Sequence, residues 1–151
     1  MDVSYDSLLE DLAVSERAMS EGTLSKVMRA MSDLLNLLRD AKKICGEIEI
    51  YASQIPSGKV IDDDGDLSGF LENAYSRVES LLEQARRIRL FGAIPLLHLA
   101  SFYLLRSRYV ILTHDFPDLS IPEPYMHRTT IGEVFAAVLG GPWAVASLLK
   151  K

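Results

Sequence analysis

Apolar residues recur at helical spacing along most of the chain, and short stretches rich in glycine, proline or acidic residues separate them. Repeats of three and four residues predict a first helix around Leu8, a long second helix over about 24–48 and a third helix from about Ser68. From Ile94 to about His114 the chain is apolar on nearly all sides, as expected for a central helix with several neighbours. The pattern predicts an all-α fold, a bundle of about four helices with a small C-terminal element.

Residues that interrupt helices predict where these elements begin and end. Ser7 and Glu10 have the spacing of a capping box at the start of the first helix. The stretch 53–69 contains prolines, glycines and an acidic run, which together predict an exposed loop. Gly92 and Pro95 predict a break or kink, because proline lacks the backbone donor that an α-helix uses. We therefore divide the chain into a helical domain at 1–119, a linker at 120–130 and a small or truncated C-terminal segment at 131–151.

Composition and charge narrow the function classes. The chain has 151 residues, 48% of them hydrophobic, and a net charge of −5, which is typical of one globular domain rather than of a protein that coats nucleic acid. The single cysteine, Cys45, excludes an internal disulfide and a cysteine-based zinc site. The start of the chain lacks the pattern of a secretory signal, and Pro95 and His98 interrupt the most apolar run. We expect a cytoplasmic protein with no membrane span.

Motifs that would carry catalysis or metal binding are few. An EF-hand register through the acidic run at 62–66 would place Val60 and Leu71 at ligand positions, where neither can bind calcium. The sequence contains no Gly-x-Ser-x-Gly turn, no His-Glu-x-x-His motif and no phosphate-binding glycine loop. We therefore expect no catalytic, cofactor-binding or metal-binding residues, and a protein that is not an enzyme.

Arg108 and His114 supply the one catalytic alternative. An arginine followed by four to six residues and a histidine resembles the motif of the HEPN helical ribonucleases, in which the pair cleaves RNA at a dimer interface. Histidine can transfer a proton, and arginine can stabilise the charge of a phosphorane-like transition state.

The region from Gln84 to Arg108 contains five arginines and no acidic residue. These arginines can bind phosphates, but arginine at helix interfaces more often pairs with carboxylates. The acidic first helix, with Asp6, Glu10 and Glu16, and a partner subunit are the expected sources of those carboxylates. The candidate residues for structural or partner ion pairs are Arg86, Arg89, Arg106 and Arg108.

Apolar residues on the long second helix and near the C-terminus predict an interface with a partner. The second helix carries a wider apolar stripe than its expected intramolecular neighbours need, and the C-terminal aromatic residues have little mass around them. The candidate interface residues are Met28, Met31, Leu35, Phe135 and Trp143. We expect the chain to self-associate or to require a protein partner.

Two stretches resemble a known family. Leu104–Ile111 (LLRSRYVI), followed by Phe116–Leu119 (FPDL), is similar to the central helix of GINS replication-complex subunits, and Pro142–Lys151 resembles the closing segment of their small B domain. The order of helical domain, linker and small domain is that of one of the two GINS subunit types. The resemblance implies a non-catalytic scaffold subunit of an archaeal-like, helicase-associated DNA-replication complex, located at the nucleoid. Its partners would be protein subunits, its contact with DNA indirect, and Arg106 and Arg108 structural.

A second class of function is a small helical subunit of a CRISPR effector complex, which binds nucleic acid. Such a subunit needs a basic surplus to neutralise phosphates, because the affinity rests on counterion release. The surplus of this chain is acidic, with 16 lysines and arginines against 21 aspartates and glutamates. The replication scaffold is therefore the favoured hypothesis.

Overall fold

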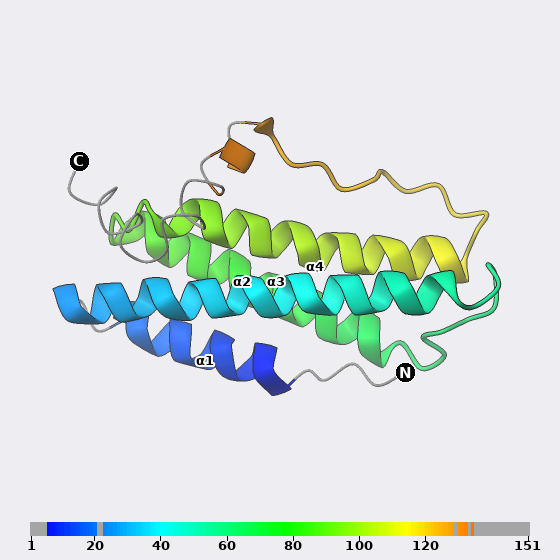
Figure 1. The fold of residues 1–151 in the computed structure, drawn as a ribbon, viewed down its shortest axis with the longest axis horizontal. Coiled ribbons are helices and arrows are strands. Elements are labelled where there is room, and N and C mark those ends of the chain that lie inside the picture. Colours follow the sequence, from blue (N-terminus) through cyan, green and yellow to red (C-terminus); the bar gives the residue numbers. More distant parts are fainter. Residues whose placement is uncertain (1–5, 21–22, 129, 133, 135–151) are drawn as a thin grey trace.

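A computed structural model describes residues 6–20, 23–128, 130–132 and 134. It contains four long helices, and the described residues form no β-strand (Figure 1). The predicted all-α bundle is thereby confirmed. The helices are α1 (Asp6–Ser20), α2 (Leu24–Ser53), α3 (Asp66–Arg87) and α4 (Ala93–Asp115).

The helices form a ring in which each packs on two others. α2 packs against α1 and α4, and α3 packs against α4 and α1, so that α2 and α3 lie diagonally across the bundle. α2 and α4 run in the same direction. With 15 residues, α1 is half as long as α2, and Figure 1 shows it along only the N-terminal half of that helix. The long α2 therefore has more apolar surface than α1 and α4 together cover.

The core consists mainly of leucines and alanines from all four helices, and α2 adds Met31, Ile44 and Ile48. Each fully buried side chain contributes roughly 1.5–3 kcal/mol to folding. The sequence assigned Met31 to a partner interface, and this is wrong. Its side chain has no exposed surface and belongs to the core of the bundle. The largest fully buried side chains are Leu8, Leu12, Met31, Leu34, Leu37, Ile48, Leu71, Leu81, Leu82, Leu96, Leu97 and Leu104.

One predicted helix boundary differs in the structure and one is confirmed. Ser7 does not cap α1, since the helix already includes Asp6, and the Ser7 hydroxyl instead donates to Asp40 Oδ2 of α2 at 3.0 Å. The predicted break at Gly92 and Pro95 is confirmed, because α3 ends at Arg87 and α4 begins at Ala93. Pro95 is the third residue of α4, where the missing N–H has no intrahelical acceptor. The 23 residues of α4 thus form one uninterrupted helix.

The end of α3 explains Arg89, which the sequence assigned to an ion pair. Arg89 has a φ of 61° and occupies the left-handed position of a Schellman motif, in which the Leu90 amide donates to the Ala85 carbonyl at 2.8 Å. Leu90 is buried and completes the motif with an apolar contact. No carboxylate in the described part of the chain pairs with Arg89. Within the described residues, Arg89 therefore turns the backbone, and an ion pair with a partner subunit stays a prediction.

After α4 the chain turns back over the bundle. Residues 116–128, here called the return segment, run back along α4 toward its N-terminal half (Figure 1). The backbone is helical again at 128, 130–132 and 134, and Val134 is buried. Of the predicted C-terminal segment at 131–151, the structure describes residues 131, 132 and 134. None of the described helices is long and apolar enough to span a membrane.

Candidate partner-binding groove

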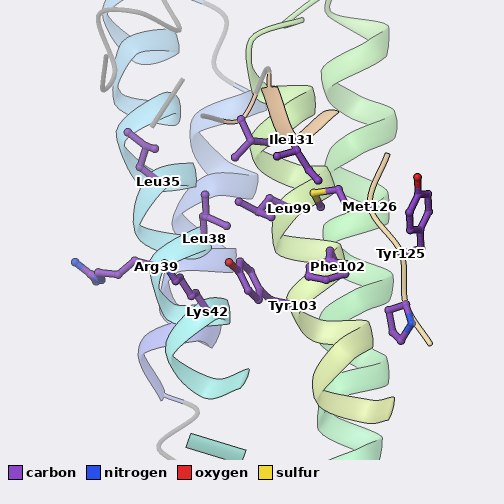
Figure 2. A pocket seen from close by; sticks show the side chains of 12 residues that line it. Leu35, Leu38, Arg39, Lys42, Leu99, Phe102, Tyr103, Tyr125, Met126 and Ile131 are labelled. Atoms are coloured by element: carbon purple, nitrogen blue, oxygen red, sulfur yellow. The ribbon is translucent and has the colours of Figure 1, made fainter. Parts of the chain in front are cut away.

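A cavity of about 710 Å³ lies between α2 and α4, beneath the return segment (Figure 2). This volume falls in the range of roughly 300–1,000 Å³ that is typical of binding pockets. Its lining is mainly apolar and comes from α2, α4, the return segment, and Ile131 and Val134 beyond that segment. The lining residues are Leu35, Leu38, Arg39, Lys42, Leu99, Phe102, Tyr103, Pro124, Tyr125, Met126, Ile131 and Val134.

The apolar character of α4 produces this groove. One side of α4 carries Leu97, Ala100 and Leu104 into the core, and another side carries Leu99, Phe102 and Tyr103 toward the groove. Figure 2 shows the latter side chains facing Leu35 and Leu38 of α2 across the opening. Phe102 and Tyr103 meet edge to face, with ring centroids 5.6 Å apart. The groove is thus the side of α4 that no helix of the described chain covers.

The described residues at the rim of the groove carry positive charge. Arg39 and Lys42 lie one turn apart on α2, and no aspartate or glutamate is among the described lining residues. The Arg39 guanidinium is partly neutralised, because Nε and Nη2 donate to Asp40 Oδ1 at 3.3 and 3.2 Å. Lys42 is exposed to solvent. The rim therefore favours an anionic group.

Arg106 ties the return segment to the bundle. Its Nε donates to Glu49 Oε1 of α2 at 2.6 Å, and its Nη1 donates to Glu123 Oε1 at 3.2 Å. The hydrogen bond to Glu49, and to a lesser degree the hydrogen bond to Glu123, raises the pKa of the Arg106 guanidinium. Glu123 directly precedes Pro124, which lines the cavity. Arg106 of α4 therefore links α2 to the return segment above the groove.

The remaining predicted arginines have weaker contacts. Arg86 lies 3.9 Å from Glu83 on the surface of α3, and Arg108 of α4 lies 3.8 Å from Glu72 of α3. The sequence named the acidic first helix and a partner subunit as sources of carboxylates, and within the described residues both arginines instead contact acids of α3. The arginine that reaches α1 is Arg77, whose Nε donates to Glu16 at 2.9 Å. Helix register decides these partners, and charge content alone does not reveal it.

A pair of carboxyl groups lies between α1 and α2. Burial, together with the hydrogen bond to Asp40 and its charge, raises the pKa of Asp11 to about 7. Burial alone would also raise the pKa of Asp40, but hydrogen bonds from Asp11, Ser7 and Arg39 lower it instead. A proton on Asp11 therefore stabilises a charged Asp40, and this pair holds Arg39 near the groove.

The opposite end of α4 is fully occupied by hydrogen bonds. His114 Nδ1 lies 2.8 Å from Asp115 Oδ1, and Nε2 lies 2.9 Å from the carbonyl oxygen of Ile55. Both ring nitrogens thus face acceptors. The hydrogen bond to Asp115 has the larger effect and the one to Ile55 the smaller, and both raise the pKa of the His114 imidazole. Asp115 also accepts from the amides of Ile61 and Asp62 at 2.9 and 3.2 Å. We call this set of contacts the His114–Asp115 latch.

The latch continues into α3 through the acidic run. Asp62 accepts from the amides of Leu67 and Ser68 at 3.1 and 3.0 Å, which satisfies two donors of the first turn of α3. Gly65, with a φ of 77°, makes the turn that permits this. Within the described residues, no three histidine, cysteine or acidic side chains are arranged to hold a metal ion. Asp62 is thus a helix cap.

The arginine and histidine of the HEPN-like motif face different elements. Arg108 approaches Glu72 of α3, whereas His114 contacts Ile55 in the loop after α2. His114 is also buried. A proton-transfer role for this histidine would require breaking the latch.

Comparison with known proteins adds no relative. No family model, curated protein or solved structure matches the chain. The function must therefore be argued from the groove itself.

Sequence reasoning found one wall of the groove and missed the other. Leu35 lines the cavity, and Met28 is half-buried without lining it. Phe135 and Trp143 lie outside the described residues. Phe102, Tyr103 and Leu99 were missed, although an all-round apolar α4 was the signal that could have identified them.

Proposed function

We propose that this protein is a non-catalytic helical subunit that binds a partner protein through the groove between α2 and α4. The observation that carries the proposal is the open apolar cavity, walled by Leu35 and Leu38 on one side and Leu99 and Phe102 on the other. Grooves between helices commonly receive an apolar helix face from a partner. The sequence resemblance suggests the assembly, a GINS-type complex associated with a replicative helicase.

Two features support binding over catalysis. The described lining of the groove is mainly aromatic and aliphatic, and it contains no histidine, cysteine or carboxylate. The titratable groups with raised pKa values at His114 and Asp11 are engaged in contacts between helices and loops. Tyr125 is 80% exposed at the edge of the groove, as an anchor for a partner would be.

Recovery of the tagged full-length chain from its native cells tests this proposal. Phe102→Asp places a charge in the groove, and Tyr125→Ala removes an exposed lining residue that no core contact requires. We expect both variants to lose a stoichiometric partner that the unmodified chain retains. Asn73→Asp, on the exposed face of α3, is the matched control and retains the partner.

The identity of the recovered partner then separates the functions. Helicase or primase components support the replication scaffold, whereas guide RNA supports the CRISPR alternative. A partner that remains bound to both groove variants, each verified as folded by circular dichroism, contradicts the proposed site.

A further inference from the structure

We infer that the partner segment which fills the groove is a short amphipathic helix carrying carboxylates beside its apolar face. This inference rests on the proposed function and concerns the chemistry of the occupant. The rim charge and the length of the groove point to it.

The charge of the described rim is one-sided. Among the described residues, Arg39 and Lys42 are the charged side chains that line the cavity, and α4 and the return segment contribute none. The two cations lie three residues apart on one helix, which places them about one turn from each other. A partner helix with acidic residues at the same spacing can pair with both. A basic partner would meet like charge at the rim, which is unfavourable.

The length of the groove limits the occupant. On α2 the lining extends from Leu35 to Lys42, which corresponds to about 10 Å of helix at 1.5 Å per residue. On α4 it extends only from Leu99 to Tyr103. Two or three helical turns with two large apolar side chains fill such a space.

Charge also argues against the chain's own C-terminal residues as the occupant. Residues 135–151 contain no aspartate or glutamate and end in Lys150 and Lys151. Their net charge has the same sign as the rim. An acidic segment from another protein is the better complement.

Fluorescence anisotropy with two synthetic peptides tests the inference. Both are helices of about 14 residues, or about four turns, with one identical leucine face. One carries glutamates beside that face and the other carries lysines. The full-length protein should bind the glutamate peptide about tenfold more tightly at low salt, a difference of about 1.4 kcal/mol, and the preference should shrink at about 0.5 M salt.

Charge reversal locates the effect. Lys42→Glu should abolish or invert the preference, whereas Lys43→Glu, the same charge change at an exposed position outside the cavity, should retain it. Equal affinities for both peptides, or a preference that survives Lys42→Glu, would overturn the acidic partner. If both peptides bind equally and Phe102→Asp prevents both, the groove still docks partners and only this inference fails. Binding of neither peptide contradicts the inference and the proposed function together.

Discussion

α3 and α4 pack against each other and have nearly the same length, 22 and 23 residues, yet their outer faces differ. α3 buries one apolar face and presents Glu72, Asn73, Ser76 and other polar side chains to solvent. α4 buries a similar face but presents Leu99, Phe102 and Tyr103 to a groove. α3 is therefore complete within the chain, while α4 carries apolar surface beyond what the bundle needs.

This difference distinguishes residues that hold the fold from residues that are available to a partner. Leu104 and Phe102 are two residues apart on α4, but Leu104 is 1% exposed in the core and Phe102 borders open space. The loss of unfolding free energy on truncating each side chain should reflect its burial rather than the size of the side chain. The following predictions use this contrast, from the largest expected effect to the smallest.

Core leucines of the two helices should behave alike. Leu81→Ala on α3 and Leu104→Ala on α4 each leave a cavity at a fully buried position, and each should lower the free energy of unfolding by about 2–5 kcal/mol. Urea denaturation measures both. A loss below about 1 kcal/mol for Leu104→Ala would mean that Leu104 does not pack in the core of the bundle.

Asp115→Asn should be the next most damaging change. The amide that replaces one carboxylate oxygen cannot accept from a backbone N–H, so one of the amides of Ile61 and Asp62 loses its partner. We expect a loss of about 1–3 kcal/mol in urea denaturation. Asp118→Asn, at an exposed position three residues later, is the matched control and should change little.

The latch should also make stability depend on pH. Since the pKa of His114 is raised in the folded protein, its contribution is fully present below the unfolded value of about 6.5 and is lost as the pH rises through the folded value. The difference in unfolding free energy between the unmodified chain and His114→Asn should therefore shrink as the pH rises above this range. Asp11, whose pKa is about 7, titrates in both proteins, so its contribution to the unfolding free energy cancels in the difference. A difference that is constant from pH 5 to about 9 contradicts the latch.

Phe102→Ala should have a smaller effect on stability than its size suggests. A buried phenylalanine costs about 3–5 kcal/mol when truncated, but Phe102 borders the groove, so we expect about 1 kcal/mol. Ser76→Ala on the outer face of α3 should lie within about 0.5 kcal/mol of zero. Thermal unfolding compares the two. A cost for Phe102→Ala that equals that of Leu104→Ala would show that the groove is filled within the chain itself.

Much of the fold follows from the sequence because helical periodicity is local. The spacing around Leu8, Leu34 and Leu81 is enough to place three helices, and the apolar run from Ile94 identifies the central one. The end of α3 at Arg89 was not predictable in the same way, since a left-handed arginine replaces the glycine that usually marks it.

The site depends on information that is not local. Which arginine meets which carboxylate is set by the register of packed helices, so Arg106 finds Glu49 and Glu123 rather than the acids of α1. The rotation of α2 buries Met31 and leaves Leu35 at the groove, although both belong to one apolar stripe. The path of the return segment over α4 had no signal beyond its prolines.

Photo-crosslinking in native cells tests the central claim that the groove on α4 is the partner-binding surface. A photo-reactive phenylalanine analogue replaces Phe102 in one full-length protein and Asn73, on the exposed face of α3, in the other. We predict that the analogue at Phe102 crosslinks to a single partner protein, through an acidic amphipathic segment, and that the analogue at Asn73 does not. Crosslinks from position 102 that stay within the same chain, at residues 135–151, or identical patterns from both positions would contradict the account.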